Sequence, residues 1–269
     1  VLAKVEDKTC FLFCNSTDMI YALMKQLNIL DKSAVFCSDK SVDKLKGLKF
    51  KSANSTWNEN NMKHYNWLTS RFYNAVDIEI KECPNVLFLT DCYIAEYTMF
   101  DPNTDIIQCA GRFRNGITSL SLISNINKGF PIRNRDYLNG CIQCSKDIYD
   151  MIKCLYEQAR SNKIQQEVYK ATLDALPFTQ YITPDGRINY FAIDNYIDNE
   201  LVKGIYSSNE NLHLALFCND SFNVVSYQTN FYKLGDYERL RRENKSISLK
   251  EKRKIIVEQL ELLGDCETE

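Results

Sequence analysis

The sequence has no excess of charge of either sign. Lys and Arg total 33 and Asp and Glu total 35, so the formal net charge is -2. The chain therefore lacks the global basic signature of a histone-like or ribosomal nucleic-acid binder. Any contact with nucleic acid must come from local basic patches or from backbone amides.

Long apolar runs are also missing. No window of 18 or more uninterrupted apolar residues occurs, and the start, VLAKVEDKTC, lacks the basic stretch and apolar run of a secretory signal. We therefore expect a soluble, cytoplasmic protein with no membrane partner. The first residue is Val and not Met, which favours a piece cut from a longer polypeptide.

A phosphate-cradling loop is the third absence. None of the nine glycines is followed by Lys, so the pattern G-x-x-x-x-G-K-[ST] does not occur. An acidic box of the kind that holds Mg²⁺ is also missing upstream of the motifs described below. We do not expect this chain to hydrolyse ATP by itself.

The 11 cysteines form no obvious disulfide framework. Their number is odd, and Cys10 and Cys14 lie in an apolar strand-like run, so we interpret most of them as reduced core residues. Cys141 and Cys144 have C-x-x-C spacing, but a structural zinc site needs four ligands and only Cys154 lies nearby. Unpaired thiols are therefore favoured over zinc or redox chemistry, and we expect no metal site.

What the sequence does contain is an alternating pattern over its first half. Between residues 8 and 127, short β-rich apolar runs alternate with helical stretches, which is typical of βαβ units. The strand-like runs are CFLFCN, SAVFCS, NVLFLTD and SLSLIS. The pattern predicts an α/β domain over residues 1–130, with a parallel sheet and flanking helices.

A different pattern follows, and with 269 residues the chain is long enough for a second domain. After a linker, FPIRNRDYLNG, we expect a helical stretch from about Ser145 to Leu176. Asp185 and Gly186 form a turn signal followed by alternating residues, which predicts a β-hairpin. A last helix is predicted from Ser248 to Gly264. Residues 131–269 are thus expected to form a mainly helical α+β accessory domain.

The strongest chemical signal is QCAGRFRNG, residues 108–116, which we place on a helix between two strands. Arg112 and Arg114 stand beside Gly111, which allows close approach to another surface. Guanidinium groups that reach across a cleft can neutralise charge on a γ-phosphate. Taken alone, the segment fits an exposed basic helix face better.

A second segment changes this interpretation. TSRFYNAVDI, residues 69–78, and QCAGRFRNG together resemble motifs V and VI of superfamily 2 helicases, and FLFCNST, residues 11–17, resembles motif IV. Motif V of that family has a threonine, a glycine six residues later and an aspartate eight residues later; Thr69, Ala75 and Asp77 stand at these offsets. The arginine spacing looks most like the helicases related to herpesvirus origin-binding proteins.

The resemblance covers roughly residues 8–127 and implies a second, C-terminal RecA-like lobe. It implies catalytic roles for Arg112 and Arg114 as arginine fingers, with Gln108 organising the phosphate end. Asp77 would hydrogen-bond the ribose or couple the nucleotide to strand movement, and Gly111 would belong to the same nucleotide site. The residues expected to contact nucleic-acid phosphates are Asn15, Ser16, Thr17, Thr69 and Ser70.

Two positions depart from the family pattern. Ala75 replaces the motif V glycine, and Asn115 stands where many relatives keep the second arginine. Neighbouring residues on a helix point about 100° apart, so Arg114 is expected to replace that arginine only in part.

The implied cofactor is ATP with Mg²⁺, held mainly by an N-terminal RecA-like lobe of the same parent chain. The implied partner is nucleic acid, with DNA favoured over RNA. The alternative is a non-enzymatic RecA-like module that binds nucleic acid or acts as a scaffold. Two basic clusters offer further phosphate contacts, one at residues 40–51 and one at residues 239–254, although both are interleaved with acids.

Overall fold

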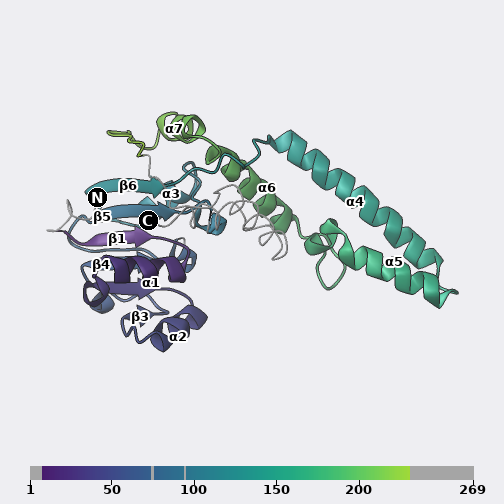
Figure 1. Ribbon diagram of the computed structural model, residues 1–269, viewed down its shortest axis with the longest axis horizontal. Coiled ribbons are helices and arrows are strands. Elements are labelled where there is room, and N and C mark those ends of the chain that lie inside the picture. The colour runs from purple at the N-terminus through teal and green to yellow at the C-terminus, as the bar shows by residue number, and fades with distance from the viewer. Residues whose placement is uncertain (1–7, 74–75, 94, 231–269) are drawn as a thin grey trace, which may run out of the picture. The chain divides into compact units, whose positions relative to one another are not determined.

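A computed structural model describes residues 8–73, 76–93 and 95–230 (Figure 1). Its centre is a six-stranded sheet in the order β3-β2-β4-β1-β5-β6, in which every pairing is parallel. The strands are β1 (Cys10–Phe13), β2 (Ser33–Phe36), β3 (Ala53–Asn54), β4 (Tyr65–Leu68), β5 (Asn85–Thr90) and β6 (Ser119–Ser124). The predicted parallel sheet is confirmed.

Both faces of the central strands are buried, as expected for a parallel sheet. Along β1, Cys10 and Leu12 point to one core, whereas Phe11 and Phe13 point to the other. Helices α1 (Thr17–Gln26) and α2 (Asp39–Gly47) cover the first face. Helix α3 (Asp105–Ala110), with the segment that follows it, covers the second.

The ends of α1 follow from the sequence. Ser16 is the N-cap, and its side chain accepts a hydrogen bond from the backbone N–H of Met19. Asn28, which follows the C-cap residue Leu27, has a φ of 56°, a left-handed conformation that Asn adopts more readily than most residues. The helix thus begins directly behind β1, which fixes where Asn15 and Ser16 lie.

The four strand-like runs of the sequence are β1, β2, β5 and β6, but β3 and β4 were not predicted. β4 reads YNWL, in which the polar Asn66 interrupts the apolar run. Asn66 is nevertheless fully buried, because its amide is satisfied at both ends by the backbone of Lys63. This strand matters for the site, because Thr69 is the residue that follows it.

The helical placement of the whole QCAGRFRNG segment is wrong. α3 ends at Ala110, with Gly111 as its C-cap residue. Phe113 then pairs with Ile78 in a short parallel bridge, and Arg112 and Arg114 lie in turns on either side of it. Phe113 contacts the aromatic rings of Phe11 and Phe13, and this packing favours the end of the helix at Ala110.

The second half of the described chain is mainly helical. Its helices are α4 (Arg135–Gln158), α5 (Lys163–Ala175), α6 (Tyr190–Ile205) and α7 (Asn209–Phe217). The predicted single stretch from Ser145 to Leu176 is therefore wrong in its start and in its continuity. Asn134 and Asn162 accept hydrogen bonds from backbone N–H groups as N-caps, which begins two separate helices.

The predicted β-hairpin is reduced to one antiparallel bridge, between Ile182 and Ile188. Gly186 makes the expected turn with a φ of 81°. The alternating residues after the turn do not form a strand, because Asn189 caps α6 and the chain becomes helical at Tyr190.

Helices α6 and α7 pack against the segment that follows β5. Tyr206 is fully buried with Cys92, Phe130 and Leu212, and its hydroxyl donates a hydrogen bond of 2.8 Å to the carbonyl of Phe100. The described residues up to Val225 belong to one compact unit. A boundary near residue 130 stays a prediction. The predicted last helix and the basic cluster at 239–254 lie outside the described residues.

Candidate functional site

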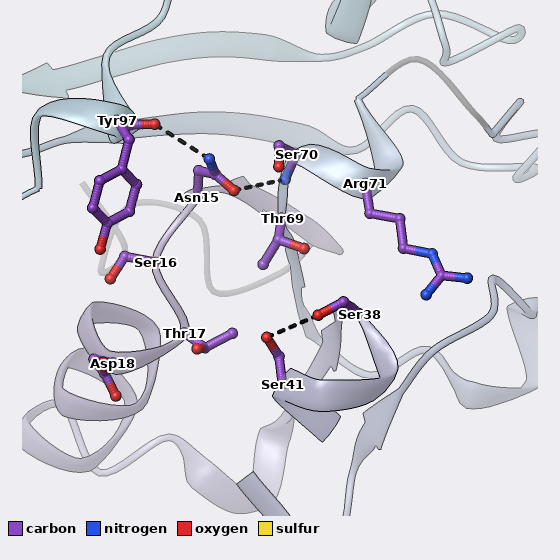
Figure 2. A pocket seen from close by; sticks show the side chains of 10 residues that line it. All are labelled: Asn15, Ser16, Thr17, Asp18, Ser38, Ser41, Thr69, Ser70, Arg71 and Tyr97. Atoms are coloured by element: carbon purple, nitrogen blue, oxygen red, sulfur yellow. Dashed lines mark hydrogen bonds between the residues drawn. The ribbon is translucent and has the colours of Figure 1, made fainter. Parts of the chain in front are cut away.

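A polar pocket of about 200 Å³ lies where several strands end. Its walls come from the segments that follow β1, β2, β4 and β5 (Figure 2). The residues that line it are Asn15, Ser16, Thr17, Asp18, Ser38, Ser41, Thr69, Ser70, Arg71 and Tyr97. All five residues expected to contact nucleic acid are among them.

The pocket lies at a topological switch point of the sheet. β1 and β4 are neighbours, but the chain leaves β1 towards β2 and leaves β4 towards β5, on opposite sides. Connections that diverge in this way open a crevice at the carboxyl ends of the strands, where open α/β sheets bind ligands. The position of the pocket is therefore a consequence of strand order.

Asn15 joins the two sides of the pocket. Its side-chain amide donates a hydrogen bond of 3.3 Å to the carbonyl of Tyr97, and its amide oxygen accepts one of 3.2 Å from the N–H of Ser70. Figure 2 shows both bonds spanning the upper rim. The segments after β1, β4 and β5 are thereby held in register before any ligand arrives.

The hydroxyl of Thr69 is already engaged. It donates a hydrogen bond to the carbonyl of Phe36 at 3.3 Å, and the N–H of Thr69 donates to the same oxygen at 3.1 Å. Thr69 is also buried, so it tethers the end of β4 to the end of β2. Its hydroxyl proton is not directed at a ligand. The side chain of Ser16 is also buried and accepts the N-cap hydrogen bond of α1, whereas Thr17 is only partly buried.

The charges around the pocket are paired. Arg71 contacts Asp39 at 3.0 Å, and Lys44 contacts Asp18 at 2.6 Å. A hydrogen bond from Ser55, and then the Arg71 guanidinium, hold the pKa of Asp39 below its usual range. Each acid in the first turn of α1 and α2 thus has a cation beside it, which reduces repulsion of an incoming anion.

A second cluster gathers three of the residues assigned to the nucleotide. Asp77 lies 2.7 Å from the Arg114 guanidinium and 3.5 Å from that of Arg112. The bridge between Ile78 and Phe113 brings the two segments together, with backbone hydrogen bonds from Ile78 to Arg112 and from Arg114 to Ile78. Arg112 and Arg114 flank Phe113, and both guanidiniums reach the same carboxylate.

Arg112 and Arg114 differ in burial. The Arg112 side chain is 27% exposed and that of Arg114 is 49% exposed. The Nε of Arg112 is buried and donates to no acceptor within the described part of the chain. The expectation that helical geometry separates Arg114 from this site is wrong, because neither arginine lies on the helix.

Gln108 and Gly111 lie near this cluster in sequence but take no visible part in it. Gln108 is exposed on α3. A side chain at Gly111 would meet only the carbonyls of Ile107, at 3.3 Å, and Gln108, both in α3 itself. Gly111 therefore does not mark an approach to another element. None of these nucleotide-assigned residues lines the pocket.

Sequence reasoning missed half of the pocket. Ser38 and Ser41 follow the predicted strand SAVF and stand at the start of α2, a signal parallel to that of Ser16 after β1. Arg71 follows Thr69 by two residues. Tyr97 lies in a short 3-10 turn, η5 (Glu96–Thr98), and no sequence pattern indicated that this turn would reach the site.

The thiols near the pocket are buried and neutral. Burial raises the pKa of Cys14 and of Cys37 to about 11. At neutral pH such thiols are poor nucleophiles. Cys141, Cys144 and Cys154 are exposed and free on α4. No group of three or more His, Cys, Asp or Glu side chains placed to hold a metal occurs among the described residues.

Of the helices described, none is both long and apolar enough to cross a membrane. Comparisons with family models, with curated proteins and with solved structures gave no match to this chain.

Proposed function

We propose that this chain is the second RecA-like lobe of an ATP-dependent nucleic-acid helicase or translocase of superfamily 2, followed by a mainly helical accessory domain. One observation carries the proposal. Two segments chosen for their motifs, Asn15–Thr17 and Thr69–Ser70, lie more than 50 residues apart in the chain and yet line one pocket at the switch point of the sheet.

The pocket suits the sugar-phosphate backbone of a nucleic acid. Its lining consists mostly of hydroxyl side chains, with one guanidinium, one amide and the carboxylate of Asp18. Hydroxyl and guanidinium groups contact phosphate oxygens without reading sequence. The openings of α1 and α2 bring further backbone N–H groups to the same rim. A strand bound here would therefore be gripped by its backbone, as a translocase that moves along any sequence requires.

The arginine cluster suits the phosphate end of a nucleotide. ATP with Mg²⁺, held mainly by an N-terminal lobe of the parent chain, supplies the phosphoryl group whose transfer drives movement. Arg112 and Arg114 present two guanidiniums to one carboxylate, so the cluster keeps a net positive charge. Phosphate oxygens can replace the Asp77 carboxylate without rearranging the backbone, because both anions accept paired hydrogen bonds from a planar guanidinium group.

In this arrangement Asp77 is the resting partner of both arginines. It lies against both guanidiniums, which are the groups that would hold a γ-phosphate. The resemblance implied either a ribose contact or a coupling of the nucleotide to strand movement for this residue, whereas the two ion pairs favour a positioning role. DNA remains favoured over RNA through the resemblance to origin-binding helicases alone.

A non-enzymatic nucleic-acid-binding module is the second candidate. The observation that favours it is the same pair of salt bridges, because both arginines have an intramolecular partner and need no nucleotide. Binding of a single strand is common to both candidates. Stimulation of an ATPase lobe belongs to the first alone.

The test is fluorescence anisotropy of a labelled single-stranded oligonucleotide, about 20 nucleotides long. A DNA oligonucleotide and an RNA oligonucleotide are each titrated with the full chain. We expect affinity to fall steeply between about 50 and 200 mM salt. Thr17→Asp places a negative charge in the pocket, yet an acid in the first turn of a helix does not destabilise it. It should weaken binding by about 10-fold or more at low salt.

Gln165→Glu is the matched control. It adds the same charge in the first turn of another helix, α5, and Gln165 does not line the pocket. Equal binding by Thr17→Asp and Gln165→Glu would overturn the pocket as a nucleic-acid site. The chain alone should show no ATPase activity above background. Turnover abolished by Arg112→Ala would contradict the assignment as a second lobe.

A further inference from the structure

Tyr97 is an exposed aromatic side chain on the rim of the pocket. It lies in η5, after β5, and is 64% exposed although it adjoins buried residues on both sides of the turn. Figure 2 shows its ring beside Ser16, across the pocket from Ser70. A ring in this position contributes little to the core and is open to a ligand in the pocket.

The turn that carries Tyr97 is held in place by hydrogen bonds of the buried Thr98. Thr98 is 1% exposed, and its hydroxyl donates to the carbonyl of Ala95 at 2.7 Å and accepts from the N–H of Asp91 at 2.9 Å. The carbonyl of Thr98 accepts a further bond from the hydroxyl of Thr90 at 2.9 Å. The carbonyl of Tyr97 itself is bonded by Asn15.

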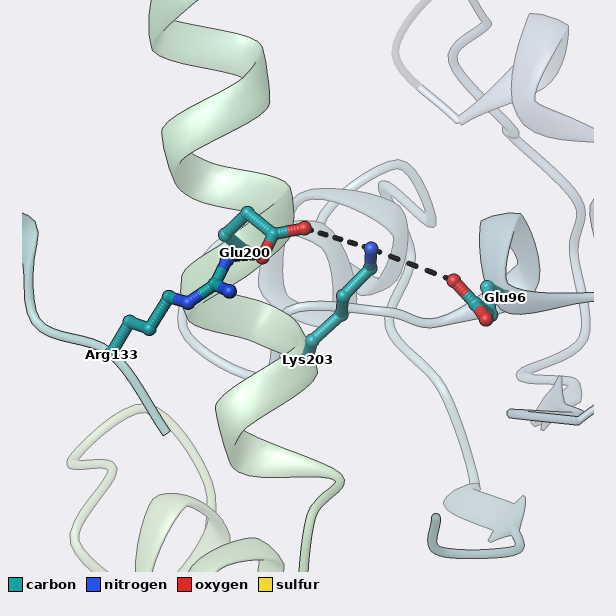
Figure 3. A network of polar contacts seen from close by, with 4 residues as sticks. All are labelled: Glu96, Arg133, Glu200 and Lys203. Carbon is teal, nitrogen blue, oxygen red and sulfur yellow. Dashed lines mark hydrogen bonds and ion pairs between the residues drawn. The ribbon is translucent and has the colours of Figure 1, made fainter. Parts of the chain in front are cut away.

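Helix α6 braces the same turn from the other side. Lys203 contacts Glu96, the neighbour of Tyr97, at 3.5 Å and Glu200 at 2.8 Å. Glu200 is nearly buried and also pairs with Arg133 at 2.7 Å (Figure 3). The backbone of Tyr97 is therefore fixed by β5, by Asn15 and by an ion-pair network, so ordering it on binding costs little conformational entropy.

We propose that Tyr97 is a stacking platform for a base of a single-stranded nucleic acid whose backbone occupies the pocket. The inference rests on the proposed function and specifies its ligand. A base can lie flat on a ring only where it is unpaired and unstacked, so the site selects single strands over duplex. Stacking uses the π-face that every base has, so it adds affinity without sequence preference.

Two kinds of contact therefore contribute to binding at one site. Hydroxyls, amides and Arg71 engage the backbone and depend on salt, whereas Tyr97 engages the base and does not. The two contributions are separable by changing the oligonucleotide instead of the protein. An abasic strand keeps every phosphate and removes every stacking partner.

The experiment compares Tyr97→Ala, Tyr97→Leu and Tyr97→Phe in the full chain, with a single-stranded oligonucleotide and with an abasic oligonucleotide of the same length. Tyr97→Ala should weaken binding of the base-containing strand by about 10-fold, in the range measured for loss of one stacked base. Tyr97→Phe should bind like the unchanged chain, because the ring and not the hydroxyl is needed. Tyr97→Leu should resemble Tyr97→Ala, which separates stacking from mere apolar contact.

The abasic strand should bind the unchanged chain and Tyr97→Ala equally, and the salt dependence of all variants should have the same slope. Phe191→Ala is the control, because Phe191 is an aromatic residue 84% exposed on α6 and outside the pocket lining. It should change nothing. Circular dichroism establishes that each variant is folded.

Two failures are distinguishable. If Thr17→Asp weakens binding but Tyr97→Ala does not, the pocket binds nucleic acid and the stacking inference is wrong. If neither substitution matters, the proposed function fails with it. A loss of affinity for the abasic strand equal to that for the base-containing strand would also overturn stacking.

Discussion

At the scale of single residues, the pocket is organised by side chains that bind the protein and not the ligand. Asn15 ties η5 to the end of β4, and Thr69 ties β4 to β2. The resemblance assigned both to nucleic-acid contacts. Their hydrogen bonds favour a positioning role, which leaves Thr17 and Arg71 among the groups that can turn towards a phosphate.

The pairing of Arg71 with Asp39 predicts a gain of affinity by substitution. Asp39→Asn removes one negative charge near the pocket and releases the guanidinium, so single strands should bind a few times more tightly at low salt. The salt dependence should steepen by about one phosphate contact. Asp43→Asn on the same helix is the control and should have less effect in anisotropy titrations. Unchanged affinity in both variants would show that Arg71 does not contact the strand.

Buried thiols predict an alkaline limit to stability. The pKa of Cys14 is raised to about 11 by burial, above the ordinary value of about 8.5 for a free thiol. A raised pKa means that the neutral thiol is favoured by folding, so this contribution is full below about pH 8.5 and is lost as the pH rises through about 11.

Urea unfolding at pH 8 and pH 10.5 measures this effect. The unchanged chain should lose more stability across this interval than Cys14→Ala, which has one titrating thiol fewer. Cys141→Ala removes an exposed thiol and should keep the original pH dependence. An identical loss in all three proteins would mean that Cys14 does not titrate with folding.

At the scale of elements, the segment after α3 departs most from what the sequence indicated. Helical periodicity was extended through Arg112 and Arg114 because no proline or strand signal interrupts it. The structure ends the helix at Ala110, because a long-range bridge between Phe113 and Ile78 offers hydrogen bonds and aromatic packing that a lone helical turn does not. Tertiary contacts of this kind cannot be read from local pattern.

The shared carboxylate predicts how the arginine cluster responds to anions. Asp77→Ala leaves two guanidiniums without their partner, and it should lower the free energy of unfolding by about 0.5 to 1 kcal/mol. Pyrophosphate should raise the thermal midpoint of Asp77→Ala more than that of the unchanged chain, because it replaces the missing negative charge.

The additional substitution Arg112→Ala in the Asp77→Ala background should abolish this stabilisation, and Arg114→Ala should reduce it by a similar amount. The similar response is expected because both guanidiniums contact the same Asp77 carboxylate in the unchanged chain. A response limited to Arg112 would support the original helical interpretation. No response in any variant would remove the basis for a phosphate site here.

At the scale of the whole molecule, much of the parallel sheet was predictable. Alternating apolar runs predicted four of six strands, and the motif segments predicted five residues of the pocket. β3 was missed because a strand of two residues is too short to show an alternating pattern. β4 was missed because the polar Asn66 interrupts its apolar run. Tyr97 was missed because its place depends on η5, Asn15 and α6, which meet only in the fold.

The contact between α6 and η5 predicts that the helical region influences the pocket. Lys203→Met keeps the length and apolar stem of the side chain but removes the charge that pairs with Glu96 and Glu200. We expect a loss of single-strand affinity of a few-fold at most, since the pair with Glu96 is partly exposed.

Two comparisons interpret that loss. It should disappear with the abasic oligonucleotide, because the turn acts through Tyr97, and it should be absent in the Tyr97→Ala background. Additive losses in the double variant would mean that α6 influences binding by another route.

The measurement that tests the central claim most directly is photo-crosslinking of a 4-thiouridine or 4-thiothymidine oligonucleotide to the full chain, followed by mass spectrometry of the linked peptides. If a single strand lies in the pocket, crosslinks should map to the peptides that contain Tyr97, Thr69–Arg71 and Asn15–Thr17. Thr17→Asp should suppress them. Crosslinks confined to the basic residues 239–254, and insensitive to Thr17→Asp, would contradict the account.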